Sequence, residues 1–269
     1  MPNTNYPRQG SILSLDTLRR TMGGKSDLYE FLSQYATRDV QLEKHEVTGH
    51  GGIVSGEYWT LANSAGSSAA NFAPVVASGG YIEGDSGTTD NGSVSLRGPI
   101  IYSGDQNCGM EVRLQIDDIT EANFEFGFID ATPGSNGPGI SNIDTPAMTA
   151  SDGALIAYDT ANTITTFAFA TDGSVTNQNV AATTFVAPAS TVFVNDKWLT
   201  FRIQIVGNFA ACWTNGILAA VHDAGTTQSV GALEGGVLLA PWFYARTREA
   251  GVARFPRIQY MNVWQDRVA

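Results

Sequence analysis

The sequence predicts an all-β protein: a two-sheet antiparallel β-sandwich preceded by a short helical N-terminal arm. Only 15 % of the 269 residues are charged and 29 are glycine, a composition that favours strands joined by turns over helices. From about residue 48 onward the apolar residues recur at every second position, as in half-buried strands. Before that point the apolar spacing is helical. We therefore expect an arm over residues 1–47 and a sandwich over residues 48–269.

The arm is expected to hold two short amphipathic helices. The first ten residues contain two prolines and no periodicity, which indicates an extended segment. Residues 11–22 then have one apolar helical face, and Gly23-Gly24 ends it. Ser26 is the expected N-cap of the second helix. Because helices this short cannot bury their apolar faces alone, these faces predict a partner-binding surface. Its residues are Ile12, Leu15, Leu18, Met22, Leu28, Phe31, Leu32 and Tyr35.

The sandwich is predicted from alternation and turns. Residues 110–116, 124–128 and 198–206 alternate between apolar and polar side chains, as strands with one wet face do. Asn215-Gly216 lies between two apolar runs and predicts a tight hairpin. Residues 258–264 form the last expected strand, and residues 132–148 read as a long loop. No convincing helix follows residue 40, so two packed antiparallel sheets are expected.

Charge and cysteine content exclude several classes of protein. Residues 48–245 carry four basic and 18 acidic side chains, so this part of the chain should repel nucleic acid. No stretch is apolar for long enough to span a membrane, and no secretion signal is recognised at the N-terminus. We therefore expect synthesis in the cytoplasm. Two cysteines in such a chain, Cys108 and Cys212, are expected to be free and buried.

Several segments resemble the concanavalin A-like lectin/glucanase (LamG-like) family. Asp196-Lys-Trp-Leu-Thr-Phe-Arg-Ile-Gln-Ile-Val, followed by Cys212-Trp-Thr-Asn-Gly-Ile-Leu, is similar to a recurring hairpin of that family. Met110-Glu-Val-Arg-Leu, Phe124-Glu-Phe-Gly-Phe, Pro241-Trp-Phe-Tyr-Ala-Arg and Tyr260-Met-Asn-Val-Trp fit the same pattern. The resemblance covers about residues 53–265 and implies a jelly roll. It implies little about function, because that fold hosts lectins, glucanases and inert structural modules.

An acidic jelly roll behind a helical arm also resembles the capsid decoration (cement) proteins of tailed bacteriophages. This resemblance implies a non-enzymatic virion structural protein on the capsid surface that stabilises the phage head. Its partners would be the major capsid protein or other virion subunits, and a dimer or trimer is expected. The alternative is a carbohydrate-binding, lectin-like module of a phage head or tail fibre, with surface glycans as ligands. No nucleic-acid or membrane partner is expected.

Catalytic residues are not evident in the sequence. The glucanases of the resembled family place three acidic residues at alternate positions of one strand, whereas Glu125 is flanked there by Asn123 and Gly127. A lone glutamate on the wet face of a strand is expected to be solvated. The neighbours Asp117 and Asp118 point to opposite faces of a strand and are expected to make turn hydrogen bonds. The sequence therefore predicts no enzyme.

Ligand-binding residues are left open by the sequence. No cofactor is expected, although lectins of the resembled family carry calcium in loops rich in Asp and Asn. The loop residues that could hold a structural calcium ion here are Asp85, Asp90, Asn91, Asn142 and Asp144. Aromatic side chains that could either stack on a sugar or belong to the core are Trp59, Tyr81, Tyr102 and Tyr158.

Overall fold

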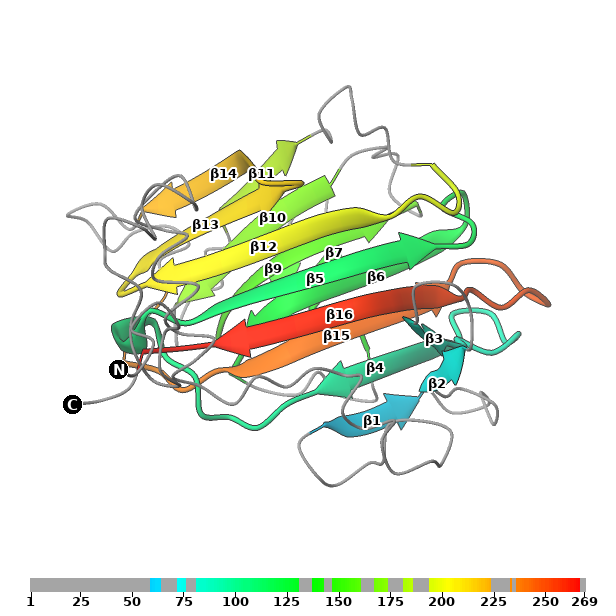
Figure 1. The fold of residues 1–269 in the computed structure, drawn as a ribbon, viewed down its shortest axis with the longest axis horizontal. Helices are drawn as coiled ribbons and strands as arrows, with labels where there is room; N and C mark the ends of the chain where they lie inside the picture. Colours follow the sequence, from blue (N-terminus) through cyan, green and yellow to red (C-terminus); the bar gives the residue numbers. More distant parts are fainter. Residues whose placement is uncertain are drawn as a thin grey trace, which may run out of the picture.

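A computed structural model describes residues 59–63, 72–75, 81–130, 137–142, 147–160, 167–173, 181–185, 194–223, 233 and 236–266. The arm over residues 1–47, its eight apolar partner-binding residues and the domain boundary after residue 47 all lie outside these residues, so they stay predictions. The described chain folds into two stacked antiparallel sheets, as the alternation of apolar residues predicts (Figure 1). We call them sheet A and sheet B.

Sheet A has seven strands in the order β1-β4-β15-β6-β9-β10-β11. Neighbours that are far apart in sequence, such as β4 and β15, show that the chain crosses repeatedly between the two layers. Their bounds are β1 Thr60–Asn63, β4 Ser93–Arg97, β15 Ala240–Thr247, β6 Ala122–Ile129, β9 Asp152–Asp159, β10 Phe167–Gly173 and β11 Ala181–Phe185.

Sheet B has seven strands in the order β14-β13-β12-β5-β16-β3-β2 and lies in front in Figure 1. The predicted Asn215-Gly216 hairpin joins β13 to β14, and both of its residues have positive φ. The bounds are β14 Ile217–Asp223, β13 Phe209–Thr214, β12 Leu199–Val206, β5 Gly109–Ile116, β16 Pro256–Trp264, β3 Tyr81–Gly84 and β2 Phe72–Val75.

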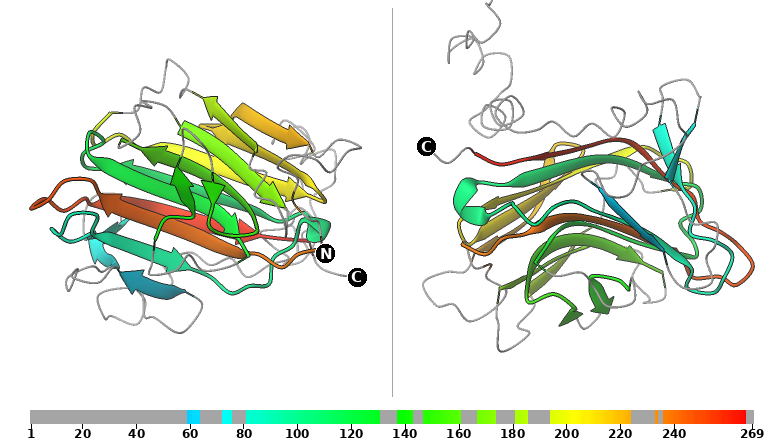
Figure 2. Two further views of the ribbon diagram at one scale, coloured as in Figure 1. Left: turned by 180° about the vertical axis from the view of Figure 1, so that it is seen from behind. Right: turned by 90° about the horizontal axis from the view of Figure 1, so that it is seen from below.

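A short hairpin lies on the outer face of sheet A, where the sequence predicted only a loop. It consists of β7 (Ile140–Asn142) and β8 (Ala147–Met148), and Figure 2 shows it on the side of sheet A that faces away from sheet B. The helical content of the described residues is one 3-10 turn, η2 (Gly104–Gln106). Among the described helices none is long and apolar enough to cross a membrane.

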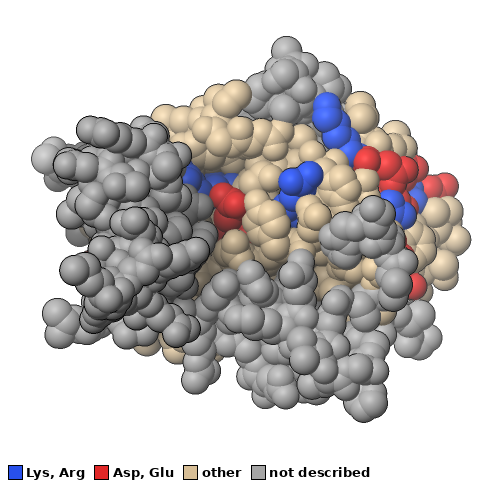
Figure 3. Space-filling model, viewed as in Figure 1, with Lys and Arg blue, Asp and Glu red and all other residues tan. Residues whose placement is uncertain are grey.

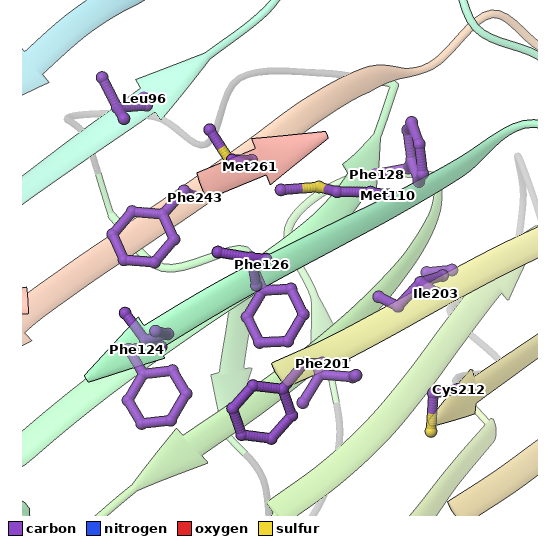
Figure 4. Close-up of a cluster of buried hydrophobic side chains, with 14 of the residues drawn as sticks. Leu96, Met110, Phe124, Phe126, Phe128, Phe201, Ile203, Cys212, Phe243 and Met261 are labelled. Carbon is purple, nitrogen blue, oxygen red and sulfur yellow. The ribbon is translucent and has the colours of Figure 1, made fainter. Parts of the chain in front are cut away.

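The core lies between the two sheets and is rich in aromatic side chains. Phe124, Phe126 and Phe128 point inward from β6 and are fully buried, with Phe201 of β12 packed against the first two (Figure 4). Each buried phenylalanine removes enough apolar surface to stabilise the fold by about 1.5–3 kcal/mol. The alternate residues of β6 point to the outer face of sheet A, and these residues determine what that face can bind.

Both cysteines are free and buried, as the sequence predicts. Burial raises the pKa of the Cys108 thiol far above its ordinary value and that of Cys212 to about 12. Neither thiol is therefore ionised near neutral pH, so both act as small apolar groups of the core.

Candidate functional site

The outer face of sheet A carries a set of polar and aromatic side chains at adjacent positions of β6, β9 and β15. Glu125 lies opposite Tyr244 of β15 on one side and opposite Ala157 of β9 on the other. One pair further along, Asn123 lies between Arg246 and Asp159, and in the other direction Gly127 lies opposite Trp242. Directly opposite side chains on one sheet face are close enough to contact each other, so these residues form one site.

Glu125 is at the centre of this face and is completely buried, so the expectation of a solvated glutamate on a wet face is wrong. Its Oε2 accepts hydrogen bonds from the backbone N–H of Gly139, at 2.6 Å, and of Ile140, at 3.1 Å. Its Oε1 has no hydrogen-bond partner among the described residues. The sequence showed the strand face on which Glu125 lies but not the hairpin that covers that face.

Burial makes Glu125 a neutral acid at neutral pH. Loss of solvation raises its pKa from 4.5 to about 8, although the two N–H donors and the nearby Arg246 favour the charged form. Asp159 adds a smaller repulsion that raises the pKa further. A carboxyl group with this pKa can donate a proton near neutral pH, which is the property of a general acid.

Two aromatic rings flank the carboxyl group. Trp242 and Tyr244 stack on each other with centroids 6.1 Å apart and planes 11° from parallel. Both are 1 % exposed, because Ile140 and Met148 of the β7–β8 hairpin belong to the same apolar cluster. In the sequence analysis Trp242 and Tyr244 supported only the resemblance to the fold and were not predicted to form a site. Their spacing, which also includes Arg246, was a signal that three such side chains share one face.

Asp159 is the second carboxylate on this face, and it is held by arginines. The Nε of Arg248 donates to its Oδ1 at 2.8 Å, and a second nitrogen of Arg248 donates to its Oδ2. The guanidinium of Arg246 lies 3.7 Å from the same carboxylate. Since Asp159 is only 2 % exposed, these two cations compensate a buried charge.

On β6 and β15, four side chains of this face have buried polar atoms with no hydrogen-bond partner among the residues that the structure describes. They are both amide atoms of Asn123, Oε1 of Glu125, Nε1 of Trp242 and Nε of Arg246. Unpaired buried polar atoms cost free energy, and folded proteins keep few of them. Four side chains of this kind on one face are therefore available to hydrogen-bond a polar ligand.

The segment that covers this face approaches it closely at Gly139. A methyl group at this position would lie 2.6 Å from Cδ1 of Leu155 and 3.1 Å from Oε2 of Glu125. A larger residue at this position would therefore have to displace the side chain of Leu155. The carbonyl of Gly139 accepts the N–H of Thr149 at 2.8 Å. This hydrogen bond joins the residue before β7 to the residue after β8, and we call the segment from Gly139 to Thr149 the cover.

The other sequence-predicted residues have varied outcomes. Of the four candidate aromatics, Trp59, Tyr102 and Tyr158 are core residues, at most 5 % exposed, and Tyr81 is partly exposed on sheet B. The expected turn hydrogen bonds are present at Asp118, which accepts from the backbone and the hydroxyl of Thr120 at 2.9 and 2.8 Å. Asp117 instead accepts the N–H of Phe255, which is distant in sequence, at 2.7 Å.

Two of the calcium candidates accept hydrogen bonds from other residues of the chain. Asp85 accepts the N–H of Gly87 at 2.7 Å, and Asn91 accepts a hydrogen bond from Arg248 at 3.1 Å. Asp144 lies outside the described residues. Within the described part of the chain, no three His, Cys, Asp or Glu side chains lie close enough together to hold a metal ion.

Comparison with known proteins gives the fold. No family model and no curated protein sequence matches the chain. Solved structures do match it over most of its length. The chain has the concanavalin A-like jelly-roll fold.

One such structure is the catalytic domain of an endo-1,3-beta-glucanase (laminarinase) from Thermotoga petrophila RKU-1. It has a TM-score of 0.55 and 10 % identity and covers 81 % of this chain and 94 % of its own. A glycoside hydrolase family 16 endo-glucanase from Bacteroides ovatus has a TM-score of 0.51 and 8 % identity, covering 78 % and 96 %. The Crh5 transglycosylase has a TM-score of 0.53 and 8 % identity, covering 80 % and 82 %. At these identities the likeness concerns the fold alone.

These structures correct the prediction that the chain is not an enzyme. The similar solved structures include endo-glucanases and a transglycosylase, so a non-enzymatic role does not follow from this fold. The prediction failed because it required three alternating carboxylates on one strand. It also assumed a solvated Glu125, whereas burial raises the pKa of this carboxyl group to about 8. A phage capsid context receives no support from these structures.

Proposed function

We propose that this chain binds a carbohydrate on the outer face of sheet A and that Glu125 is the residue on which binding depends. The observation that carries the proposal is the buried Glu125 carboxyl group, with one oxygen bound to two N–H donors and the other without a partner in the described part of the chain. Sugars offer hydroxyl groups that both donate and accept hydrogen bonds, and flat apolar faces that pack on aromatic rings. Trp242 and Tyr244 supply rings, and Asn123 and Arg246 supply further polar atoms.

Binding requires the cover to leave the face. The N–H groups of Gly139 and Ile140 donate to Glu125 as two sugar hydroxyls would, so the backbone takes the place of a ligand in the closed state. The cover includes a short two-stranded hairpin, and Gly139 and Ile140 donate its described hydrogen bonds to Glu125 of the sheet. A glycan that replaces both donors to Glu125 therefore recovers the hydrogen bonds lost on displacement.

A second candidate is glycoside hydrolysis at the same place, and the raised pKa of Glu125 is the observation that favours it. Hydrolysis needs an acid to protonate the glycosidic oxygen and a second carboxylate to act as nucleophile or base. Glu125 has the properties of the acid. The described part of this face also holds Asp159, whose charge is bound by Arg248 and Arg246, and Asp172 of β10, which lies opposite Gly153 of β9.

Titration calorimetry with laminari-oligosaccharides and mixed-linkage β-glucan oligosaccharides tests the proposal. We expect saturable binding that is weakened about tenfold or more by Glu125→Ala, because a charge-assisted or acid hydrogen bond is lost. Glu121→Gln, at an exposed position beside the same strand, is the matched control and should bind like the wild type. Equal binding by Glu125→Ala, or no binding by any form, would overturn the proposal. Release of reducing ends by the wild type, abolished in Glu125→Gln, would assign hydrolysis.

The virion role predicted from the sequence stays a prediction. It depended on the arm helices, which lie outside the described residues, and on a resemblance of style. Co-sedimentation of the protein with capsids at a fixed copy number would support it, and absence of co-sedimentation would count against it.

A further inference from the structure

The outer face of sheet B carries interleaved arginines and aromatic rings, several of which are exposed or partly exposed. Figure 3 views this face and shows basic and acidic side chains over the strands at its centre. The strand register shows which residues lie beside the two arginines of this face. Arg113 lies between Thr200 and Tyr260, and Arg202 lies between Trp213 and Glu111. These residues therefore form one lattice across β13, β12, β5 and β16.

The tryptophans separate clearly between the core and this face. Three of the five, Trp59, Trp242 and Trp264, are at most 1 % exposed. The remaining two, Trp198 and Trp213, are partly exposed and both lie on the outer face of sheet B. Large aromatic side chains left accessible on a sheet are a feature of binding surfaces.

Each of these two rings has a guanidinium beside it. Arg202 lies 4.1 Å from the centroid of the Trp213 ring, and Arg113 lies 5.9 Å from that of Trp198. Tyr81 meets Trp198 edge to face at 5.8 Å and extends the aromatic surface. Cation–π contacts of this kind hold both the ring and the guanidinium in place without using the hydrogen-bond donors of the arginine.

The charged side chains on this face differ in whether they have a partner within the protein. Arg257 is bound to the carboxylates of Glu83, at 2.6 Å, and Asp196, at 2.5 Å. Glu111 accepts the hydroxyl of Tyr260 at 2.7 Å. Arg113 is exposed, and among the described residues it has no carboxylate within ion-pair distance. Its donors are therefore available to an anion from outside.

The two arginines on this face are positively charged, whereas residues 48–245 as a whole are strongly negative. Residues 48–245 contain four basic and 18 acidic side chains, and two of the four basic ones, Arg113 and Arg202, stand on this face, each beside an accessible tryptophan. An anionic ligand is repelled by most of the molecule and attracted here. The net charge of -11 makes a nucleic acid a poor partner, because a long phosphate backbone would extend over acidic surface.

We propose that the outer face of sheet B, centred on Trp198 and Arg113, binds a polysaccharide that carries carboxylate groups, such as a polyuronate. The pyranose ring packs flat on Trp198, and its carboxylate takes two parallel hydrogen bonds from Arg113. Trp213 and Arg202 form a second cation–π pair on the same sheet face. This site is separate from the covered face of sheet A and does not depend on the function proposed there.

Binding of oligogalacturonates measured by titration calorimetry at low and at moderate salt tests this inference, with neutral laminari-oligosaccharides as the comparison. We expect binding that weakens as salt rises and that falls about tenfold in Trp198→Ala and in Arg113→Gln. Lys197→Gln removes a neighbouring cation from the turn before β12 and should bind as the wild type does. Glu125→Gln should also leave this binding unchanged, which separates the two sites.

Circular dichroism and the urea midpoint show whether each variant is folded, and Arg113→Gln, at an exposed position, keeps the test valid if Trp198→Ala is destabilised. Absence of oligogalacturonate binding by the folded wild type would overturn the inference. So would binding that Trp198→Ala and Arg113→Gln both retain. Binding of single-stranded DNA with loss in these variants, and no binding of uronate, would overturn it in favour of another polyanion.

Discussion

Replacement of Glu125 by glutamine is expected to change how the stability of the protein depends on pH. The folded-state pKa of Glu125 is about 8, against 4.5 for an ordinary glutamate, so the folded protein holds a proton that the unfolded chain releases. Stability from this group is therefore fully present below the unfolded value and is lost as pH rises toward the folded value. Glutamine is neutral throughout, and its amide oxygen can still accept from Gly139 and Ile140.

The magnitude follows from the two pKa values. At about 1.4 kcal/mol per pH unit, a shift of this size corresponds to at most about 4–5 kcal/mol between about pH 4 and about pH 8. The free energy of unfolding of Glu125→Gln minus that of the wild type should increase over this range. Urea denaturation followed by tryptophan fluorescence at several pH values measures it, with Glu121→Gln as the exposed control. A difference that stays constant with pH would refute the buried, protonated carboxyl.

Three further results are expected. Gly127→Ala should destabilise the protein by about 2 kcal/mol or more, because φ is +144° there and the new methyl group would lie 2.1 Å from a carbonyl oxygen. Gly236→Ala, where the nearest atom is 3.5 Å away, is its control in urea denaturation. Arg248→Met should cost about 3–5 kcal/mol by leaving the buried Asp159 poorly paired, and adding Asp159→Asn should recover much of that loss. The two buried cysteines should react with a thiol reagent only after unfolding, and reaction in the native protein would contradict their burial.

The fold could be predicted from the sequence because alternation reports directly on which side of a strand meets the core. Residues 110–116 and 124–128 alternate and are strands β5 and β6, and the Asn215-Gly216 turn is where the sequence placed it. Alternation alone does not report on what covers the second face of a strand. Strand β9 is buried on both faces because the β7–β8 hairpin lies over sheet A, and no periodicity signals that contact.

The candidate site was missed for the same reason. Glu125 was recognised as a lone carboxylate, but its chemistry comes from burial and from the backbone donors of Gly139 and Ile140, which are distant in sequence. Asp159 and Arg248 meet through the pairing of β6 with β9 and β15, which a single sequence does not reveal. The residue type of Glu125 and the strand face on which it lies could be predicted from the sequence. Its burial and its hydrogen-bond donors could be learned only from the structure.

The central claim is that a glycan binds at Glu125 on the outer face of sheet A, and the most direct test is to locate the residues that a bound glycan contacts. Hydrogen exchange is followed by mass spectrometry with and without a bound β-glucan oligosaccharide. It reports on residues 137–142, of which Gly139 and Ile140 donate their backbone N–H groups to Glu125. We expect the Gly139 and Ile140 amides to lose protection when the glycan binds, because the sugar replaces them at the carboxyl group. We also expect Glu125→Ala to show this loss without any glycan. Unchanged protection of residues 137–142 in the presence of a bound glycan would contradict a carbohydrate site on this face.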